Sequence, residues 1–600
     1  DQSLGEIPPA EDVRDSLSLR THTCGELNVD HVGKWVTLCG WVQYLRYDLF
    51  VILRDFSGLT QILVPQEESA SKVKADLCDL TVESVIMVTG TVRKRPAGQE
   101  NKEMPTGEIE VLAENVEVFN VSKKLPFEIK EFVKKSESLR MQYRYLDLRS
   151  SRMQKNLRLR SQLVMKMREF LCNEHGFVDV ETPTLFKRTP GGAKEFVVPS
   201  REPGLFYSLP QSPQQFKQLL MVAGVDRYFQ IARCYRDEGS KPDRQPEFTQ
   251  VDIEMSFVDQ EGIRTLVESM LQHSWPAEKG SIQVPFQTMT YEEAMRDYGV
   301  DKPDTRFNMK LTDISDIFSS TQVEFLRSAL DQPEGSIQAI LVPCGAVRRK
   351  PSHELSLVLV RTDGTLKSPL KKLLSASVTD VLIKKTQAQP GDLLLIAAGT
   401  LHSVRPLLGS LRLQCAELLE SHGRPVRDPL AFHFLWVVDF PLFLPKEDEP
   451  QELESAHHPF TAPLPEDTAL LFTEPHKVRG QHYDLVLNGC EIGGGSIRIH
   501  RASEQLYVLK NILKEDPSQL THLLEALDFG APPHGGIALG LDRLVSIIVG
   551  AASIRDVIAF PKSFRGHDLM SRAPDTVSDK DLTPYHIYVK WPTKQGGEEK

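Results

Sequence analysis

Two strand-like runs between Phe229 and Phe257 flank a loop that is crowded with charged side chains. Apolar and polar residues alternate on both sides of a Gly-Ser-Lys-Pro-Asp break, a pattern typical of an antiparallel hairpin. The charged residues of this hairpin are Arg233, Arg236, Asp237, Glu238, Asp243, Arg244 and Glu247. The arginines could hold a polyanionic ligand over the sheet, with the carboxylates orienting them or binding a metal ion. The alternative is a solvated charged loop, because exposed clusters of charge are common.

Two other segments place polar residues at the start of an expected helix. Ser212, Gln214 and Lys217 lie near such a start in the segment from Tyr207 to Gly224. Free backbone N–H groups and polar side chains there suit an anionic small molecule. Further along, a glycine-rich strand leads into a helix with Arg543 in its first turn. That arginine could hold a phosphate, although glycine before a helix is also common in ordinary packing.

Polar side chains surround a triple glycine in the run from Tyr483 to His500. They are expected on alternating strands and are Asp484, Asn488, Glu491 and Arg498. Asp484 and Glu491 supply hard oxygen ligands of the kind that Mg²⁺ accepts, usually together with substrate phosphates. The glycines let a ligand approach the backbone closely. This segment therefore predicts a magnesium site beside a bound ligand.

The elements that precede these residues read as a small β-domain followed by a long helix. Thr21 to about Pro126 contains five short β-rich runs separated by turn residues, which suits a barrel of the oligonucleotide-binding type. The exposed sheet face of that fold binds single-stranded nucleic acid. The candidates are Phe50 for base stacking, Gln61 for base edges, and Arg46, Arg93 and Arg95 for phosphates. An ordinary core aromatic is the alternative for Phe50.

A long helix is expected from about Ser151 to His175, because apolar residues recur at helical spacing and Gly176 follows. The strand FVDVETP comes next, and the pair could form a dimer interface or one core element.

Composition is that of an ordinary globular protein, with 600 residues, 40% of them hydrophobic, and a net charge of -11. This acidic balance excludes a histone-like binder but not a local basic surface. The eight cysteines are scattered singly and no pair has zinc-ribbon spacing. This favours a reducing compartment and argues against a structural zinc site. No apolar stretch approaches the roughly eighteen residues of a membrane span, and no signal peptide is visible. The first residue is Asp1 and not Met, which a cleaved organelle transit peptide or recombinant expression would explain.

Three segments resemble the motifs of the class II aminoacyl-tRNA synthetases. The long helix with FVDVETP resembles motif 1, RCYRDEGSKPDRQPEFTQVDIEMSF resembles motif 2, and GIALGLDRL resembles motif 3. Three further runs look like the bacterial-type aspartyl-tRNA synthetases, namely QSPQQFKQLLM, HHPFTAP and NGCEIGGGSIRIH. Several long motifs in the right order make the resemblance specific, and it covers most of the chain.

The resemblance implies a multidomain α+β protein. Its parts are an N-terminal OB-fold barrel that binds the anticodon, an antiparallel-sheet catalytic domain, and an inserted α/β domain between motifs 2 and 3. The expected boundaries are a flexible arm at 1–18, the barrel at 19–126, a hinge at 127–150, the catalytic domain at 151–300 and 431–562, the insert at 301–430, and a C-terminal extension at 563–600.

The implied activity is that of an aspartate–tRNA ligase. Aspartate and ATP would give aspartyl-adenylate, and the aspartyl group would pass to the 3′ end of tRNA-Asp. A homodimer that uses Mg²⁺ is implied, with neither DNA nor membrane as a partner. Two alternatives remain: asparaginyl or lysyl specificity within the same class, and a non-catalytic tRNA-binding paralogue. The presence of both arginines and both carboxylates speaks against the paralogue.

The resemblance also assigns roles to individual residues. The ATP-binding residues would be Arg236, Asp237, Glu238, Gln245, Phe248, Glu491, Gly540, Leu541, Asp542 and Arg543. Among them, Arg236 and Arg543 would be catalytic, holding the α- and γ-phosphates, and Phe248 would stack on adenine. The aspartate-binding residues would be Gly191, Ser212, Gln214, Lys217, Arg236, Gln250, Asp252, His457, His458 and Arg498. Mg²⁺ would bind Asp484 and Glu491.

The physical chemistry agrees with these implied roles. Adenylation is an in-line displacement at phosphorus, and arginines with Mg²⁺ stabilise the charge that develops. No general base is required, because the aspartate carboxylate is already ionised near neutral pH. Lys217 and Arg498 would select aspartate over asparagine, since the neutral amide leaves buried cations without a counter-charge, at a cost of roughly several kcal/mol. The alternative for both cations is an ion pair with Asp252 or Glu254.

The chain departs from the bacterial pattern in three places. The usual Pro-Glu-Gly after motif 1 is here Pro190-Gly191-Gly192, so one carboxylate near the amino acid is missing. The barrel has Tyr44-Leu45-Arg46 where bacterial relatives carry more arginine, and the insert is short. These departures suit an organelle enzyme that meets few tRNAs, and the expected location is the mitochondrial matrix.

Overall fold

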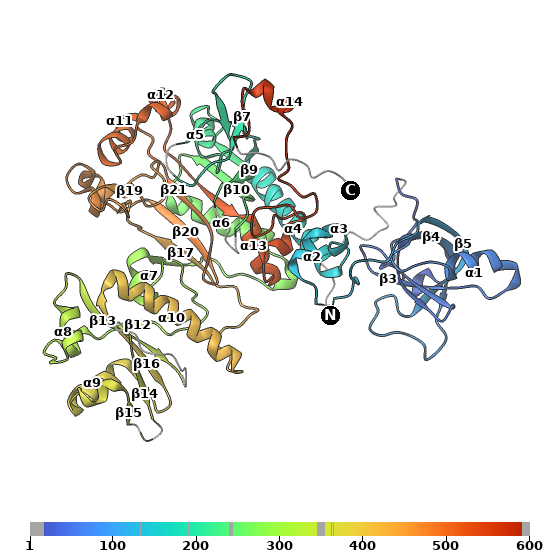
Figure 1. The fold of residues 1–600 in the computed structure, drawn as a ribbon, viewed down its shortest axis with the longest axis horizontal. Coiled ribbons are helices and arrows are strands. Elements are labelled where there is room, and N and C mark those ends of the chain that lie inside the picture. The colour runs from blue at the N-terminus through green and yellow to red at the C-terminus, as the bar shows by residue number, and fades with distance from the viewer. Residues whose placement is uncertain are drawn as a thin grey trace.

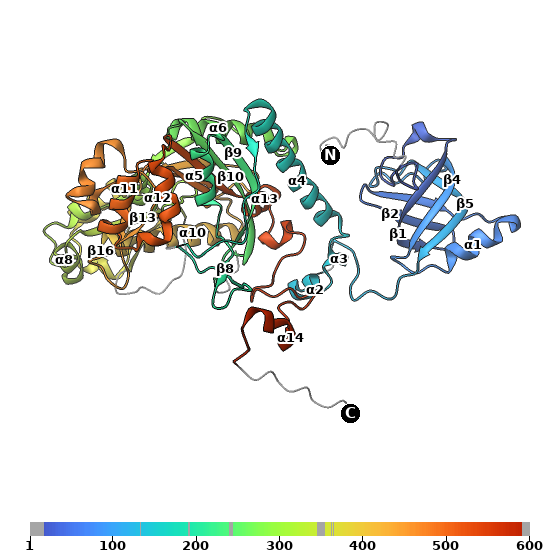
Figure 2. The same ribbon diagram turned by 90° about the horizontal axis from the view of Figure 1, so that it is seen from above.

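The computed structural model describes residues 17–131, 134–189, 192–238, 244–344, 355–361, 363 and 365–590. A β-barrel lies at one end of the molecule and a domain with its own small sheet at the other, with a large mixed sheet and its helices between them (Figures 1 and 2). No helix in the described part of the chain is long and apolar enough to cross a membrane.

The N-terminal domain is a closed five-stranded barrel with the strand order β1-β2-β3-β5-β4. Its elements are β1 (Trp35–Arg46), β2 (Phe50–Arg54), β3 (Leu59–Leu63), α1 (Ser71–Cys78), β4 (Val85–Lys94) and β5 (Ile109–Asn120). Alternate residues of β1 and β4 point into one apolar core, as the period of two in the sequence predicts. The prediction of an OB-type barrel is therefore confirmed.

Helices connect the barrel to the central sheet. They are α2 (Glu137–Gln142), α3 (Arg144–Asp147) and α4 (Ser151–Arg168), and a π-helical turn (Glu169–Glu174) extends the last. The Ser150 side chain caps α4 by accepting a hydrogen bond from the Met153 N–H. Gly176 has a positive φ of 66°, which ends the helix where the sequence predicts. The strand that follows is shorter than FVDVETP, because only β6 (Val178–Asp179) pairs with a neighbour.

The central sheet has eight strands in the order β11-β17-β20-β21-β22-β10-β9-β6. They are β9 (Arg227–Tyr235), β10 (Glu247–Ser256), β11 (Gln287–Thr290), β17 (Phe434–Val438), β20 (His482–Leu487), β21 (Cys490–Ile497), β22 (His534–Gly540) and β6. Only the outermost pairs, β6 with β9 and β11 with β17, run parallel. The largest apolar core joins this sheet to α4, α6 (Gln260–Ser274) and α13 (Leu541–Val549).

Shorter elements surround the central sheet. They are β7 (Val197–Pro199), β8 (Phe206–Ser208), α5 (Gln214–Val222), α7 (Tyr291–Tyr298), β18 (Phe443–Pro445), β19 (Leu453–Ser455), α11 (Ala502–Tyr507), α12 (Thr521–Asp528) and α14 (Asp579–Leu582). The strand-like run that begins at His586 forms no strand over residues 586–590, and Tyr588 in it is exposed.

The inserted domain has a five-stranded antiparallel sheet in the order β12-β13-β16-β14-β15. Its elements are β12 (Leu311–Asp313), α8 (Glu324–Leu330), β13 (Gly335–Val342), β14 (Leu355–Val360), β15 (Leu366–Lys367), α9 (Ala376–Thr386), β16 (Leu393–Thr400) and α10 (Leu401–Ser421). Arg412 of α10 is buried, lies 3.8 Å over the Phe307 ring, and donates to the backbone carbonyls of Asp304 and Phe307. Helix α10 thereby fastens the inserted domain to the segment that leads into it.

Candidate functional site

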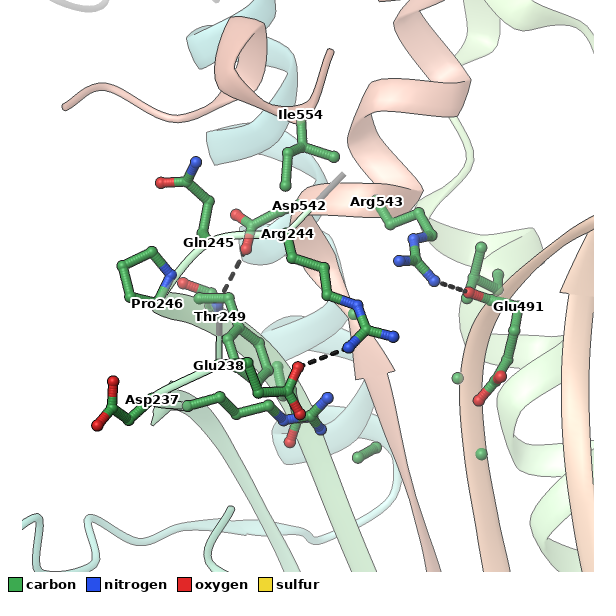
Figure 3. Close-up of a pocket in the computed structure, with 18 of the residues that line it drawn as sticks. Asp237, Glu238, Arg244, Gln245, Pro246, Thr249, Glu491, Asp542, Arg543 and Ile554 are labelled. Carbon is green, nitrogen blue, oxygen red and sulfur yellow. Dashed lines mark hydrogen bonds and ion pairs between the residues drawn. The ribbon is translucent and has the colours of Figure 1, made fainter. Parts of the chain in front are cut away.

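A pocket of about 670 Å³ opens over the central sheet where β10, β21 and β22 lie side by side. Its lining comes from the hairpin of β9 and β10, the triple glycine of β21, the junction of β22 with α13, and residues 563–566. Arg543 and Glu491 lie on one side of it, and Asp237, Gln245 and Pro246 lie on the other (Figure 3). The motifs that could bind a polyanion therefore meet in one place.

The hairpin has the register that alternation predicts, with Phe248 opposite Cys234 and Glu247 opposite Tyr235. The Arg236 guanidinium lies 4.9 Å over the Phe248 ring, a distance that allows a cation–π contact. Its buried Nε has no hydrogen-bond partner within the described residues. Arg236 therefore lies at the pocket with its Nε–H group available to a ligand.

The loop of the hairpin is only partly described. Asp243 lies outside the described residues. Arg244 pairs with Glu238 at 2.5 Å across the pocket mouth (Figure 3). Asp237 lines the pocket, whereas Arg233 is half-exposed and bonds to Thr249 and Glu247.

At the start of α13, Arg543 faces the pocket, whereas the carboxylate of its neighbour Asp542 bonds to other parts of the protein. Arg543 Nη1 donates to the carbonyl oxygen of Glu491 at 2.9 Å. Asp542 accepts from the Thr249 N–H at 3.0 Å and from Arg160 at 2.5 Å, so its carboxylate joins the hairpin to α4. The Leu541 side chain is buried in the core, and only Gly540 of this pair lines the pocket. Gly540 could therefore meet a nucleotide through its backbone, whereas Leu541 packs in the core.

Gln245 is engaged by the C-terminal segment rather than free for a ligand. Its side-chain oxygen accepts from the Lys562 N–H at 2.7 Å, and its amide donates to the Lys562 carbonyl at 2.9 Å. Lys562 Nζ also pairs with Glu247 at 3.0 Å. These contacts hold the adjoining residues Ser563 to Gly566 as a wall of the pocket, a role that no pattern in the sequence revealed.

A buried cluster of four charges lies directly behind the pocket. Lys217 Nζ pairs with Asp252 at 3.0 Å and with Glu254 at 3.4 Å, and Arg498 Nε pairs with Glu254 at 3.1 Å. Each of these side chains is at least 98% buried. The ion-pair alternative for Lys217 and Arg498 is thus realised, and the charges of the cluster sum to zero.

The carboxylates of the cluster differ in their environment. Burial raises the pKa of Asp252, although Lys217 opposes the effect, and its Oδ2 atom has no partner within the described residues. Burial acts in the same direction on Glu254, but Arg498 and Lys217 outweigh it and hold the pKa of that carboxyl below its usual range. One buried acceptor of the cluster, Asp252 Oδ2, therefore remains for a ligand cation.

Two of the three histidines at the pocket were candidates from the sequence. Arg498 Nη1 donates to His458 Nε2 at 2.7 Å, so His458 separates the buried cluster from the pocket. Burial and the Arg498 charge lower the pKa of His458 well below its usual value, and the ring is a neutral acceptor. His457 lies 3.1 Å from Asp484, which raises its pKa against the effect of burial. His482, which sequence reasoning missed, stacks on Phe440 at 4.2 Å.

Asp484 and Glu491 converge on the same glycine. A Cβ at Gly494 would lie 2.8 Å from Asp484 Oδ1 and 3.6 Å from Glu491 Oε1. Burial raises the pKa of Glu491, the Asp484 charge raises it further, and His457 and Lys302 partly oppose both effects. A divalent cation would relieve this repulsion, so the two residues fit Mg²⁺. Within the described residues no three or more acidic, histidine or cysteine side chains form a complete metal site, so substrate oxygens would supply the remaining ligands.

Only some of the remaining residues predicted to bind the amino acid lie at the pocket. Gln250 lines the pocket, but Ser212 and Gln214 do not. Gln214 donates to Gln218 within α5. Gly191 lies outside the described residues.

The barrel candidates divide into exposed and buried side chains. Arg46 pairs in register with Phe50, and the Phe50 side chain is half-buried. Arg93 is half-exposed and pairs with Glu110 at 3.3 Å. Gln61 is buried and donates to Glu110, and Arg95 is buried and donates to the Ile109 carbonyl. Gln61 and Arg95 thus serve the interior of the barrel.

Two family models match the chain. Residues 136–564 match the model of class II tRNA synthetases (D, K and N), and residues 36–119 match that of an OB-fold nucleic acid binding domain. The "Aspartate--tRNA ligase, mitochondrial" of Homo sapiens is 62% identical over 97% of this chain and 93% of its own length. The "Aspartate--tRNA(Asp/Asn) ligase" of Dictyoglomus turgidum is 44% identical over 97% of this chain and 100% of its own.

Solved structures of similar fold are more distant in sequence. The asparaginyl-tRNA synthetase from Pyrococcus horikoshii with asparaginyl-adenylate aligns with a TM-score of 0.56 at 20% identity, covering 90% of this chain and 98% of that one. A putative aspartyl-tRNA synthetase from Leishmania major aligns with a TM-score of 0.57 at 19% identity, covering 91% and 94%. These likenesses show the fold.

Proposed function

This chain belongs to the class II tRNA synthetases of the D, K and N group, and we propose that it is an aspartate–tRNA ligase. It activates L-aspartate with ATP to aspartyl-adenylate and passes the aspartyl group to the 3′ end of tRNA-Asp. The proposal is carried by one observation: a pocket with Arg236 and Arg543 facing it lies directly in front of a buried, paired cluster of two cations and two carboxylates. The full-length similarity to aspartate–tRNA ligases supports the choice of amino acid.

ATP fits the pocket through contacts at its two sides. Phe248 stacks on adenine, and Arg236 beside it holds the α-phosphate together with the reacting carboxylate of aspartate. Arg543 holds the γ-phosphate from the opposite side. Both arginines act as fixed cations without a proton transfer, which suits a displacement in which only negative charge moves.

Asp484 and Glu491 are the residues that would hold Mg²⁺. A bound Mg²⁺ supplies charge neutralisation on the phosphate oxygens. The glycines of β21 keep this part of the floor open, because a side chain at Gly494 would meet both carboxylates.

Aspartate is selected by the buried cluster. Its side-chain carboxylate is held by Lys217 and Arg498, and its ammonium group by the free Oδ2 atom of Asp252. His458 gives up its contact with Arg498 when the substrate enters. Asparagine would bring a neutral amide to two desolvated cations, which costs roughly several kcal/mol in discrimination.

The barrel binds the anticodon of tRNA-Asp through its exposed side chains. Arg46 and Phe50 lie side by side in register, and Arg93 is half-exposed. An arginine beside an aromatic ring suits a backbone contact and base stacking. Gln61 and Arg95 are left out of this surface, because both are buried with protein partners.

The working form is a homodimer in the mitochondrial matrix. Exposed apolar side chains on the motif 1 elements, Met165 of α4 and Val178 of β6, support a second copy as the partner. The mitochondrial location follows from the names of the similar ligases in Homo sapiens and Rattus norvegicus.

Charging of purified tRNA with labelled aspartate tests the proposal. We expect aspartate-dependent, ATP-dependent charging of mitochondrial tRNA-Asp. Charging of tRNA-Lys with lysine, or no charging of any tRNA while the protein is folded, would contradict it.

A further inference from the structure

Lys302 is an exposed cation at the pocket, separate from the two arginines and from the buried cluster. Its side chain lines the pocket, and it has no ion pair or hydrogen-bond partner among the residues that the structure describes. Arg244 by contrast is paired with Glu238 there, and Arg543 donates to the Glu491 carbonyl. Lys302 is thus a full positive charge available to an anion in the pocket.

The backbone packing places Lys302 on the side of the pocket that holds Glu491 and Arg543. A Cβ at Gly489 would lie 2.9 Å from the Cβ of Asp304, so the turn before β21 packs directly against the segment of Lys302.

The segment of Lys302 is held rigidly from the side of the inserted domain. The Asp304 carboxylate accepts hydrogen bonds from the backbone N–H, Nε and Nη2 of Arg306 at 2.8–3.1 Å. Arg412 of α10 donates to the Asp304 carbonyl at 2.9 Å. An exposed lysine on an anchored backbone loses less freedom when it binds a ligand than one on a free loop.

We propose that Lys302 binds the β- and γ-phosphates of ATP and neutralises the leaving pyrophosphate, which rests on the function proposed above. In that reaction an oxygen of the aspartate carboxylate forms a bond to the α-phosphorus. The bond from the α-phosphorus to the bridging oxygen breaks, and its electron pair leaves with pyrophosphate. Lys302 transfers no proton in this step and supplies positive charge where the leaving group gains negative charge. The inserted domain, through Arg412 and Asp304, holds this lysine in place.

Aspartate-dependent exchange of inorganic pyrophosphate into ATP tests the inference. We expect Lys302→Ala to raise KM for pyrophosphate about tenfold to a hundredfold, the loss of a charge-assisted contact. KM for aspartate should stay within about twofold, since such a remote contact acts on phosphate alone. Lys302→Arg should restore most of the affinity for pyrophosphate. Transfer of aspartate from preformed adenylate to tRNA should be unchanged, because pyrophosphate has already left.

Lys310→Ala is the matched control, because Lys310 is an exposed lysine of the same connecting segment that does not line the pocket. It should leave KM for pyrophosphate unchanged. An unchanged KM in Lys302→Ala, or an equal rise in Lys310→Ala, would overturn the inference alone. A wild-type chain with no aspartate-dependent exchange would overturn the proposed function, and this inference with it.

Discussion

The pocket and the buried cluster behind it both use cations to hold anions, but they keep those cations in opposite states. Lys302 has no partner within the described residues, and Arg236 rests on the face of Phe248 with an unpaired Nε. Lys217 and Arg498 are each held by carboxylates at 3.0–3.1 Å. Water can solvate a cation at an open pocket, whereas a fully buried cation must be paired.

The difference matches the proposed division of roles, with catalysis at the pocket and amino-acid specificity at the buried cluster. Under the proposed function, the pocket receives its counter-charge from a polyanion, so we expect its arginines and lysine to add little to the stability of the fold. The buried cluster is charge-balanced without a ligand, and the residues proposed to select aspartate also join β10 to α5 and to the chain directly after β21. Variants should therefore separate the two regions: pocket changes affect rates, and cluster changes affect stability as well.

Lys217→Met gives the largest expected effect. The Asp252 and Glu254 carboxylates would lose their shared cation in a fully buried site. We expect the free energy of unfolding to fall by about 3–5 kcal/mol, as for other broken buried ion pairs. Urea denaturation measures this, with Lys310→Met as an exposed control. A loss no larger than that of the control would show that the cluster does not stabilise the fold.

Arg236→Ala should abolish adenylate formation and leave the fold intact. Removing one preorganised cation from a developing charge costs about 10²–10³-fold in rate. The thermal midpoint should stay within the error of the measurement, because no ion pair is broken within the described residues. Arg233→Ala on the same hairpin is the control, since Arg233 bonds to Glu247 and Thr249 instead of lining the pocket. Near-normal pyrophosphate exchange in Arg236→Ala would refute its role.

Acid should weaken the fold through two buried histidines near the cluster. Burial lowers the pKa of His458 and of His534 below the ordinary value, so the unfolded chain binds protons that the folded chain rejects. Their contribution to the free energy of unfolding is complete above about pH 6.5, the pKa of histidine in the unfolded chain, and is lost as the pH falls below that value. Urea titrations at pH 7.5 and pH 5.5 should show this loss, and His534→Gln should reduce it. If the free energy of unfolding fell equally between pH 7.5 and pH 5.5 in His534→Gln and in the wild type, His534 would not contribute to the loss.

Gln245→Ala gives the smallest expected effect. It removes the two hydrogen bonds to Lys562 that hold the wall of residues 563–566. We expect KM for ATP to rise about two- to tenfold, because one or two neutral hydrogen bonds contribute a free energy of that size. Glu247→Gln weakens the ion pairs of Glu247 with Lys562 and Arg233 but keeps both hydrogen bonds of Gln245, so it should raise KM for ATP less. A larger rise in Glu247→Gln would place the anchoring in the ion pair instead.

The barrel and the hairpin were predictable because local pattern determines them. Alternation in β1 and β4 sets which residues face the barrel core, and the same period fixes the register of β9 with β10. The closeness of Asp484 to Glu491 was predictable as well, since a tight turn at Asn488 and Gly489 folds β21 back onto β20. Each of these depends on residues that are close in the sequence.

Features that join distant segments were not visible in the sequence. The bonds of Gln245 to Lys562 span 317 residues, and the packing of Asp304 on Gly489 depends on how the inserted domain leaves the sheet. Asp542 looked like part of the nucleotide motif, but its carboxylate ties the hairpin to α4. A motif identifies which residues occur at a site, but the tertiary contacts decide which atoms remain free for the ligand.

The proposed specificity for aspartate depends on the buried cluster of Lys217, Asp252, Glu254 and Arg498. The most direct measurement compares aspartate with asparagine in pyrophosphate exchange on the wild-type protein. We predict that kcat/KM for aspartate exceeds that for asparagine by about 10³-fold or more, because the amide would leave two buried cations unpaired. Equal exchange with the two amino acids, or exchange with asparagine alone, would contradict this account.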